Sequence, residues 1–76
     1  MVVIMKQVKI HTEYITTGQL LKHLSLVSSG GEVKFFLKNN LVFVNGEEDN
    51  RRGKKLYPND KIKILNETYK IEKNED

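Results

Sequence analysis

The sequence predicts an α+β fold in which two short helices pack on a small, mainly antiparallel sheet. Two amphipathic segments, each opened by Ser or Thr, are followed by short runs in which apolar and charged residues alternate. The first pattern is typical of helices and the second of half-buried strands, of which we expect about four to five. A chain of 76 residues with 38% hydrophobic residues suffices for a single domain, expected to span residues 1–76, and leaves no room for a deep, enclosed active site.

The first expected elements are a strand and a helix. Lys6–Ile10 alternates polar and apolar residues, which predicts a strand with its Val and Ile facing inward. Thr16 and Gln19 have the spacing of a capping box, which predicts that a helix begins there. We expect this helix to end near Ser25 or Leu26, because Ser and Gly follow.

A second helix is predicted from Ser29 to about Asn39. Ser29 and Glu32 have capping-box spacing, and the apolar stripe that follows consists of Val33, Phe36 and Leu37. Lys34 and Lys38 lie four residues apart and so share a second face, roughly 100° from that stripe.

The rest of the chain predicts two hairpins. Leu41–Val44 is a strand-like run, and Asn45-Gly46 after it is a strong signal for a type I′ turn. Residues 48–55 indicate a polar loop or a weak return strand. Residues 57–60 form a turn with Pro at its second position, and a further turn is expected at Asn66-Glu67 between two alternating runs.

The positive charge is concentrated in the middle of the chain. The formal net charge is +3, with 13 Lys and Arg against 10 Asp and Glu. Residues 34–55 contain six bases and three acids, so this segment carries the whole excess. Clustered positive charge is the usual electrostatic sign of a polyanion partner.

The residues needed for catalysis or metal binding are few. There is no Cys, and neither His11 nor His23 has partners at the spacing of a metal site or a catalytic triad. Residues 47–49 are acidic but lack the alternation and the glycine of a calcium loop. We therefore expect no catalytic residues, no metal and no cofactor. With neither a signal peptide nor a membrane span in the pattern, we expect a cytoplasmic protein without a membrane partner.

Phosphate binding is better supported by the residues. A helix N-terminus presents free N–H groups, and Gly30 and Gly31 leave that backbone uncovered. The hairpin after the second helix could bring further bases to the same side, namely Arg51, Arg52, Lys54 and Lys55. Each element also has a plainer interpretation, as an inter-helix turn or as a soluble loop.

Several of these segments together resemble the S4 RNA-binding domain. They are residues 26–29, the Val33-Lys34 and Leu37-Lys38 pairs, Leu41–Gly46 and Tyr57–Ile62. The resemblance covers about residues 17–64 as a core motif, with residues 73–76 expected to be a frayed tail. More narrowly, residues 29–34 and 51–56 resemble the small stand-alone S4-like proteins of the YaaA type in bacteria.

The resemblance implies an S4-like (αL) fold and a non-catalytic module that recognises structured RNA, ribosomal or transfer-like, alone or with a protein in a ribonucleoprotein. Carried over by position, the RNA-binding residues would be Ser29, Gly30, Gly31, Lys34, Lys38, Asn45, Arg51, Arg52, Lys54 and Lys55. One departure is Gly30, where many S4 domains have Arg. Another is Asn59, where the family's turn usually has Gly, a substitution that Asn tolerates.

Two other functions fit the pattern. Two helices before a hairpin could form a winged-helix-like DNA binder, although the second helix has no outward Arg, Asn or Gln before Asn39 to read bases. The chain could also be a protein-interaction adaptor. Phe35 is the one aromatic residue off the apolar stripe of the second helix, and we expect it to be buried against the hairpin.

Overall fold

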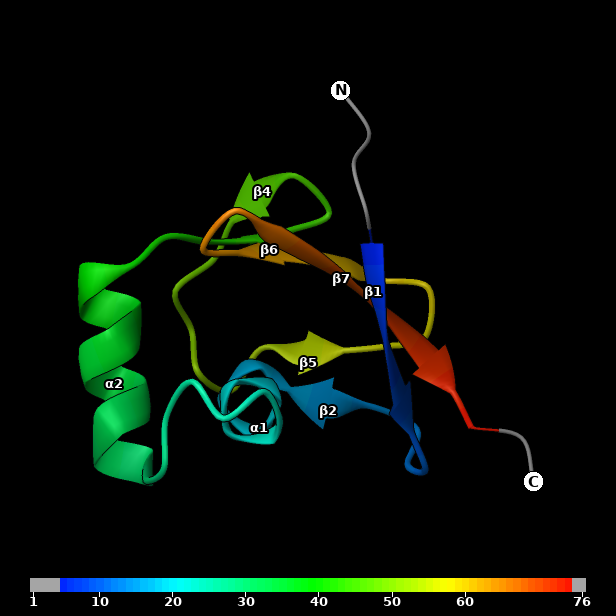
Figure 1. The fold of residues 1–76 in the computed structure, drawn as a ribbon, viewed down its shortest axis with the longest axis horizontal. Helices are drawn as coiled ribbons and strands as arrows, with labels where there is room; N and C mark the ends of the chain where they lie inside the picture. The colour runs from blue at the N-terminus through cyan, green and yellow to red at the C-terminus, as the bar shows by residue number, and fades with distance from the viewer. Residues whose placement is uncertain (1–4, 75–76) are drawn as a thin grey trace.

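The computed structural model describes residues 5–74 and contains two helices and seven strands in that range (Figure 1). In chain order they are β1 (Met5–Ile10), β2 (Ile15–Thr16), α1 (Thr17–His23), α2 (Gly30–Asn39), β3 (Val42–Val44), β4 (Glu47–Glu48), β5 (Lys55–Leu56), β6 (Lys61–Ile64) and β7 (Glu67–Lys73).

Five strands form the main sheet in the order β1-β7-β6-β3-β4. All neighbours are antiparallel except β1 and β7, which run parallel. The predicted α+β class and the mainly antiparallel sheet of about four to five strands are therefore confirmed. A second sheet pairs β2 with β5 and was not predicted, because strands of two residues are too short to show a periodicity.

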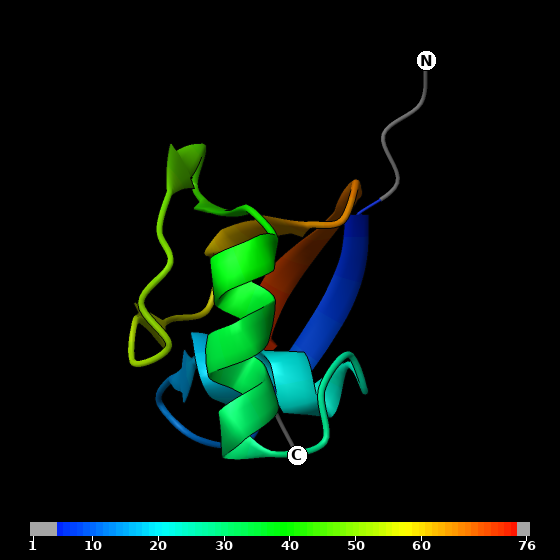
Figure 2. The same cartoon turned by 90° about the vertical axis from the view of Figure 1, so that its left-hand side faces the viewer.

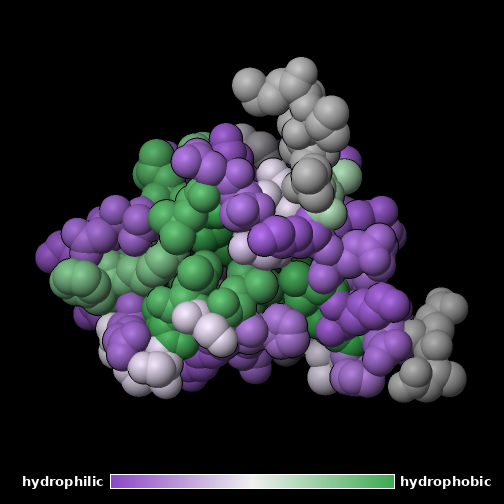
Figure 3. Space-filling view, viewed as in Figure 1, coloured by the Kyte–Doolittle hydropathy of each residue, from purple (hydrophilic) through white to green (hydrophobic). Residues whose placement is uncertain are grey.

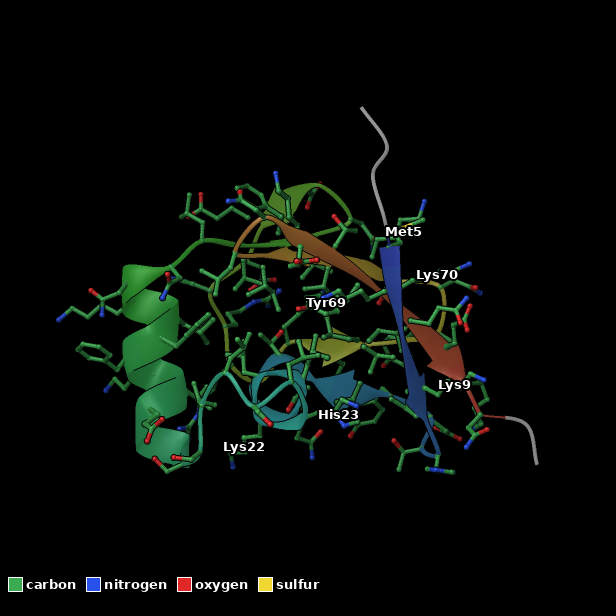
Figure 4. All side chains as sticks on the ribbon, viewed as in Figure 1. Met5, Lys9, Lys22, His23, Tyr69 and Lys70 are labelled. Carbon is green, nitrogen blue, oxygen red and sulfur yellow. The ribbon has the colours of Figure 1, made fainter. Side chains whose placement is uncertain are left out.

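The core lies between the helices and one face of the main sheet. Its fully buried side chains include Leu20 and Leu21 of α1, Leu56 of β5 and Ile71 of β7. The strands alternate as the sequence predicts, so that Tyr69 is 8% exposed and lies on the helix side, whereas Lys70 lies on the other side (Figure 4). On the face shown in Figure 3, hydrophilic residues cover β1 and β7, and apolar residues gather between the sheet and the helices. The sheet thus has a buried inner face and a polar outer face.

The predicted strand at Lys6–Ile10 and the capping box at the start of α1 are both confirmed. The expected end of α1 was too late. The helix ends at His23 with Leu24 as its C-cap, and Ser25 has a left-handed φ of 59° that turns the chain away. A cap of this geometry stops the helix two or three residues earlier than expected.

The turns follow the sequence at two of three places. Asn45 and Gly46 both have positive φ, 52° and 87°, as a type I′ turn requires. Asn59 has φ 80°, and the Asp60 N–H donates to the Tyr57 carbonyl oxygen at 3.0 Å, which closes the Pro-containing turn. The third turn is one residue earlier than expected, because Leu65 and Asn66 adopt positive φ and Glu67 already pairs with Ile64.

The start of the predicted tail is ordered. Lys73 is the last residue of β7, and the Asn74 N–H donates to the Ile10 carbonyl oxygen at 2.8 Å. Residues 75 and 76, like residues 1–4, lie outside the described range. Among residues 5–74 no helix is long and apolar enough to cross a membrane.

Candidate nucleic-acid interface

An open groove runs between α2 and the segment that joins β4 to β5. It has a volume of about 500 Å³ and is lined by Lys34, Leu37 and Lys38 from α2 and by Asn50 and Arg52 from the segment. Figure 2 shows this segment descending beside α2. Three of the cations predicted from the sequence therefore face one hollow, and none of its lining residues is acidic.

The main chain fixes the segment that carries Arg52. The N–H groups of Thr17 and Gly18, at the start of α1, donate to the carbonyl oxygens of Lys54 at 3.0 Å and of Arg52 at 2.9 Å. A Cβ on Gly18 would lie 3.4 Å from both the Arg52 carbonyl oxygen and a Val33 methyl group, so glycine lets the two helices and the segment meet closely. The backbone of Arg52 is held, and its exposed side chain is free to reach a ligand.

Arg51 is placed differently from Arg52. Its Nε and Nη2 atoms donate to the two carboxylate oxygens of Asp49 at 3.0 and 2.7 Å, a bidentate pair, and the Arg51 N–H donates to the same carboxylate. These hydrogen bonds lower the pKa of Asp49 to about 2. Arg51 is thus paired within the chain and does not line the groove.

The N-terminus of α2 is open but is already next to a carboxylate. Ser29 is the N-cap and accepts from the Glu32 N–H at 3.3 Å, as predicted. The Glu32 side chain, however, accepts from the N–H and hydroxyl of Ser28 rather than from Ser29, and these bonds lower the pKa of Glu32. A Cβ on Gly30 would meet nothing within 4 Å, so that backbone is accessible.

Lys54 and Lys55 do not line the groove either. Lys54 is half-buried in the segment that docks on α1. Lys55 Nζ lies 4.9 Å from the ring centroid of Tyr14, whose ring is 5.7 Å from that of Tyr57. The predicted cations at residues 51–55 therefore lie in at least three different environments.

Asn45 connects two turns. Its side-chain Nδ2 donates to a carboxylate oxygen of Asp60 at 3.1 Å, and its Oδ1 accepts from the Lys61 N–H at 3.0 Å. The Asn45 N–H also donates to the Lys61 carbonyl oxygen at 2.7 Å. The side chain thus has a structural task, and its contact with a ligand stays a prediction.

The expectation that Phe35 is buried was wrong, since its side chain is 71% exposed. The apolar stripe of α2 that packs on the core consists of Val33, Phe36 and Leu37, and Phe35 is turned away from it. It is three residues from Lys38 and therefore its neighbour on the helix surface. Asn50 lines the groove but was not predicted, because it stands in a polar run without a pattern.

No group of three or more His, Cys, Asp or Glu that could hold a metal occurs within residues 5–74. His11 and His23 are both exposed. The chemistry available at this surface is that of cations, amides and one exposed aromatic ring.

Comparison with known proteins points to one family. Residues 8–72 match the family model described as the S4 domain. The chain is also 51% identical over 57 residues to a Bacillus subtilis (strain 168) protein named "Probable ribosome maturation protein RlbA", an alignment covering 75% of this chain and 80% of the relative.

The Asp49–Arg51 pair predicts a pH effect. Since the pKa of Asp49 is lowered to about 2 in the fold, the carboxylate stabilises the folded state above its unfolded pKa of about 4. That contribution is lost as the pH falls toward 2. In Arg51→Gln, we expect the Asp49 titration midpoint, followed by NMR, to rise toward about 4. The free energy of unfolding of Arg51→Gln should be lower than that of wild type above pH 4, and this difference should shrink between pH 4 and 2.

Arg52→Gln is the control for this titration, because Arg52 makes no hydrogen bond to Asp49 within the described residues. It should leave the midpoint of Asp49 where it is. A midpoint near 4 in the wild-type protein would show that the bidentate pair does not form in solution.

The Asn45 hydrogen bonds predict a loss of stability on substitution. Asn45→Gly keeps a residue that tolerates the left-handed φ but removes both side-chain bonds, so we expect the free energy of unfolding to fall by about 1 to 2 kcal/mol. Asn45→Ala should cost about 1 kcal/mol more, because alanine is strained at positive φ. Urea denaturation measures both differences. Equal stability of Asn45→Gly and wild type would contradict the structural role.

Proposed function

Because the chain belongs to the S4 domain family, we propose that it is a non-catalytic module that binds structured RNA in the groove between α2 and the β4–β5 segment. The family and the relative's name support an RNA-related role in general terms. The finer statement, that this groove is the contact surface, rests on its charge and geometry.

The observation that carries the proposal is the convergence of Lys34, Lys38 and Arg52 on one hollow without an acidic lining residue. Two of these side chains project from a helix and the third from a segment whose backbone is hydrogen-bonded to α1. Cations on such a rigid frame bind phosphates at fixed positions better than cations on a flexible chain do. A folded RNA presents its phosphates in this way.

The remaining residues predicted from the sequence fit this proposal to different degrees. The accessible backbone at Gly30 and Gly31 extends the surface along α2, whereas the charge of Arg51 is already paired with that of Asp49 and attracts a phosphate less strongly. Ribosomal RNA is the target class that we favour, since the relative is named for ribosome maturation. Such a role would place the protein in the cytoplasm.

Removal of two groove cations should weaken RNA binding and lower its salt dependence. For Lys34→Gln/Arg52→Gln, the slope of log affinity against log salt should decrease by about 1.4 to 1.8 in magnitude, because two phosphate contacts are lost. Fluorescence anisotropy with a labelled rRNA hairpin at several salt concentrations measures this slope. Arg51→Gln should change it less than Arg52→Gln, since Arg51 is paired with Asp49.

The matched control is Lys9→Gln/Lys22→Gln, which removes the same charge from β1 and α1, outside the groove (Figure 4). It should retain most of the wild-type slope. If the two double variants behave alike, the groove is not the site and the proposal fails.

The exposure of Phe35 adds a second element to the surface. An aromatic ring that is 71% exposed and next to Lys38 offers a face on which an unpaired base can stack while its phosphate lies near the cation.

We expect Phe35→Ala to leave the free energy of unfolding within about 0.5 kcal/mol of wild type, because the side chain buries little. Its affinity for RNA with unpaired bases should fall by roughly 1 kcal/mol or more, a factor of about five, while affinity for a fully paired duplex stays the same. Phe35→Tyr, which retains the ring, should bind as wild type does. An equal loss on both RNAs would argue against stacking.

A further inference from the structure

The groove is the first part of a longer hollowed path. It shares Leu37, Lys38 and Asn50 with a second hollow of about 280 Å³, which reaches residues 39–42 at the C-terminal end of α2. Glu48 also lines the second hollow and is the acidic residue on the path. The surface is therefore continuous from the flank of α2 to the point where β3 begins.

The path then turns onto the outer face of the sheet. The second hollow shares Asn39, Asn40 and Leu41 with a third, of about 340 Å³, which includes Phe43 and Lys63. These last two residues also line a fourth hollow of about 360 Å³, together with Lys61, Gly46 and Thr68. Adjacent hollows share lining residues at every step, so the four lie next to one another from α2 to β6.

The pairing of the strands determines which side chains lie together at the β6 end of the path. Phe43 is opposite Lys63, Lys63 is opposite Thr68, and Lys61 is opposite Lys70, which places these side chains on one face. Lys61 and Lys63 make no ion pair within residues 5–74, whereas Lys6 lies 3.6 Å from Glu67. Outside residues 34–55 the numbers of basic and acidic residues are equal. The fold nevertheless leaves a basic patch on the outer face at β6.

Apolar surface lies between the two groups of cations. Leu41 is 60% exposed and Leu65 50%, and partly exposed Phe43 follows them. A single nucleic-acid strand presents phosphates along one edge and base faces along the other, and both match such an alternation of cations and apolar side chains. The bases of such a strand can pack on Leu41, Leu65 and Phe43 while its phosphates lie near the lysines.

We propose that the outer face of the sheet at β3 and β6 is a second RNA-contact surface, occupied by a single-stranded segment that continues from the groove over Leu41. The inference rests on the proposed function, because the groove holds the folded part of the RNA. Lys61 and Lys63 contact the phosphates of the single strand, and Phe43 stacks with one of its bases.

The test compares three RNAs, namely an rRNA hairpin alone and the same hairpin with a single-stranded extension of about eight nucleotides at its 5′ end or at its 3′ end, a length that small single-strand-binding domains cover. Wild type should bind one of the extended RNAs about tenfold more tightly than the hairpin. Lys61→Gln/Lys63→Gln should remove this gain and keep the affinity for the hairpin. Phe43→Leu, which retains an apolar side chain in the strand, should reduce the gain by about fivefold.

The two hypotheses fail in different ways. Lys34→Gln/Arg52→Gln should weaken binding of all three RNAs, and if it weakens none of them, the proposed function is wrong. If the hairpin binds through the groove but neither extension adds affinity, or if Lys61→Gln/Lys63→Gln retains the gain, the second surface is not an RNA site. Lys9→Gln/Lys22→Gln removes equal charge away from the path and should keep the full gain; its loss would mean that only net charge matters.

Discussion

The docking of the β4–β5 segment on the first turn of α1 is the interaction on which the basic surface depends. A helix begins with N–H groups that have no partner within the helix. In α1 the carbonyl oxygens of Lys54 and Arg52 satisfy two of them. The C-terminal end of the segment is held as well, because it continues into β5, which pairs with β2 immediately before α1. Arg52 therefore faces α2 through main-chain geometry and needs no side-chain contact of its own.

Pairing within the chain decides which cations remain available to a polyanion. Arg51 and Arg52 are adjacent in sequence, but within residues 5–74 the Asp49 carboxylate accepts hydrogen bonds from Arg51 and none from Arg52. Lys55 lies over the Tyr14 ring, and Lys6 lies next to Glu67. An exposed ion pair contributes little to stability, yet it changes the local field that a phosphate meets. The charge that matters for binding is thus smaller than the count in residues 34–55 and differently distributed.

Periodicity and caps were enough to predict the longer helices and strands, because each of these elements has a clear pattern, whereas the S4-like arrangement followed from the family resemblance. The alternation in β6 and β7 and the caps of both helices are local signals, and the core follows from them. The groove could be predicted only in part. That Lys34 and Lys38 share a face follows from helical spacing, but the contrast between Arg51 and Arg52 depends on side-chain rotamers. The exposure of Phe35 depends on how α2 is rotated against the sheet.

The C-terminal end of α2 determines whether a base or a phosphate of an RNA strand can lie at this point of the path. A helix C-terminus carries partial negative charge from its unpaired carbonyl groups, which disfavours a phosphate. The amides of Asn39 and Asn40 donate to the carbonyl oxygens of Phe35 and Phe36, and Lys38 stands in the last turn, so this charge is partly offset. Leu41 follows directly and is exposed. The crossing point therefore suits the apolar face of a base, and phosphates fit on either side of it, at Lys38 and at Lys63.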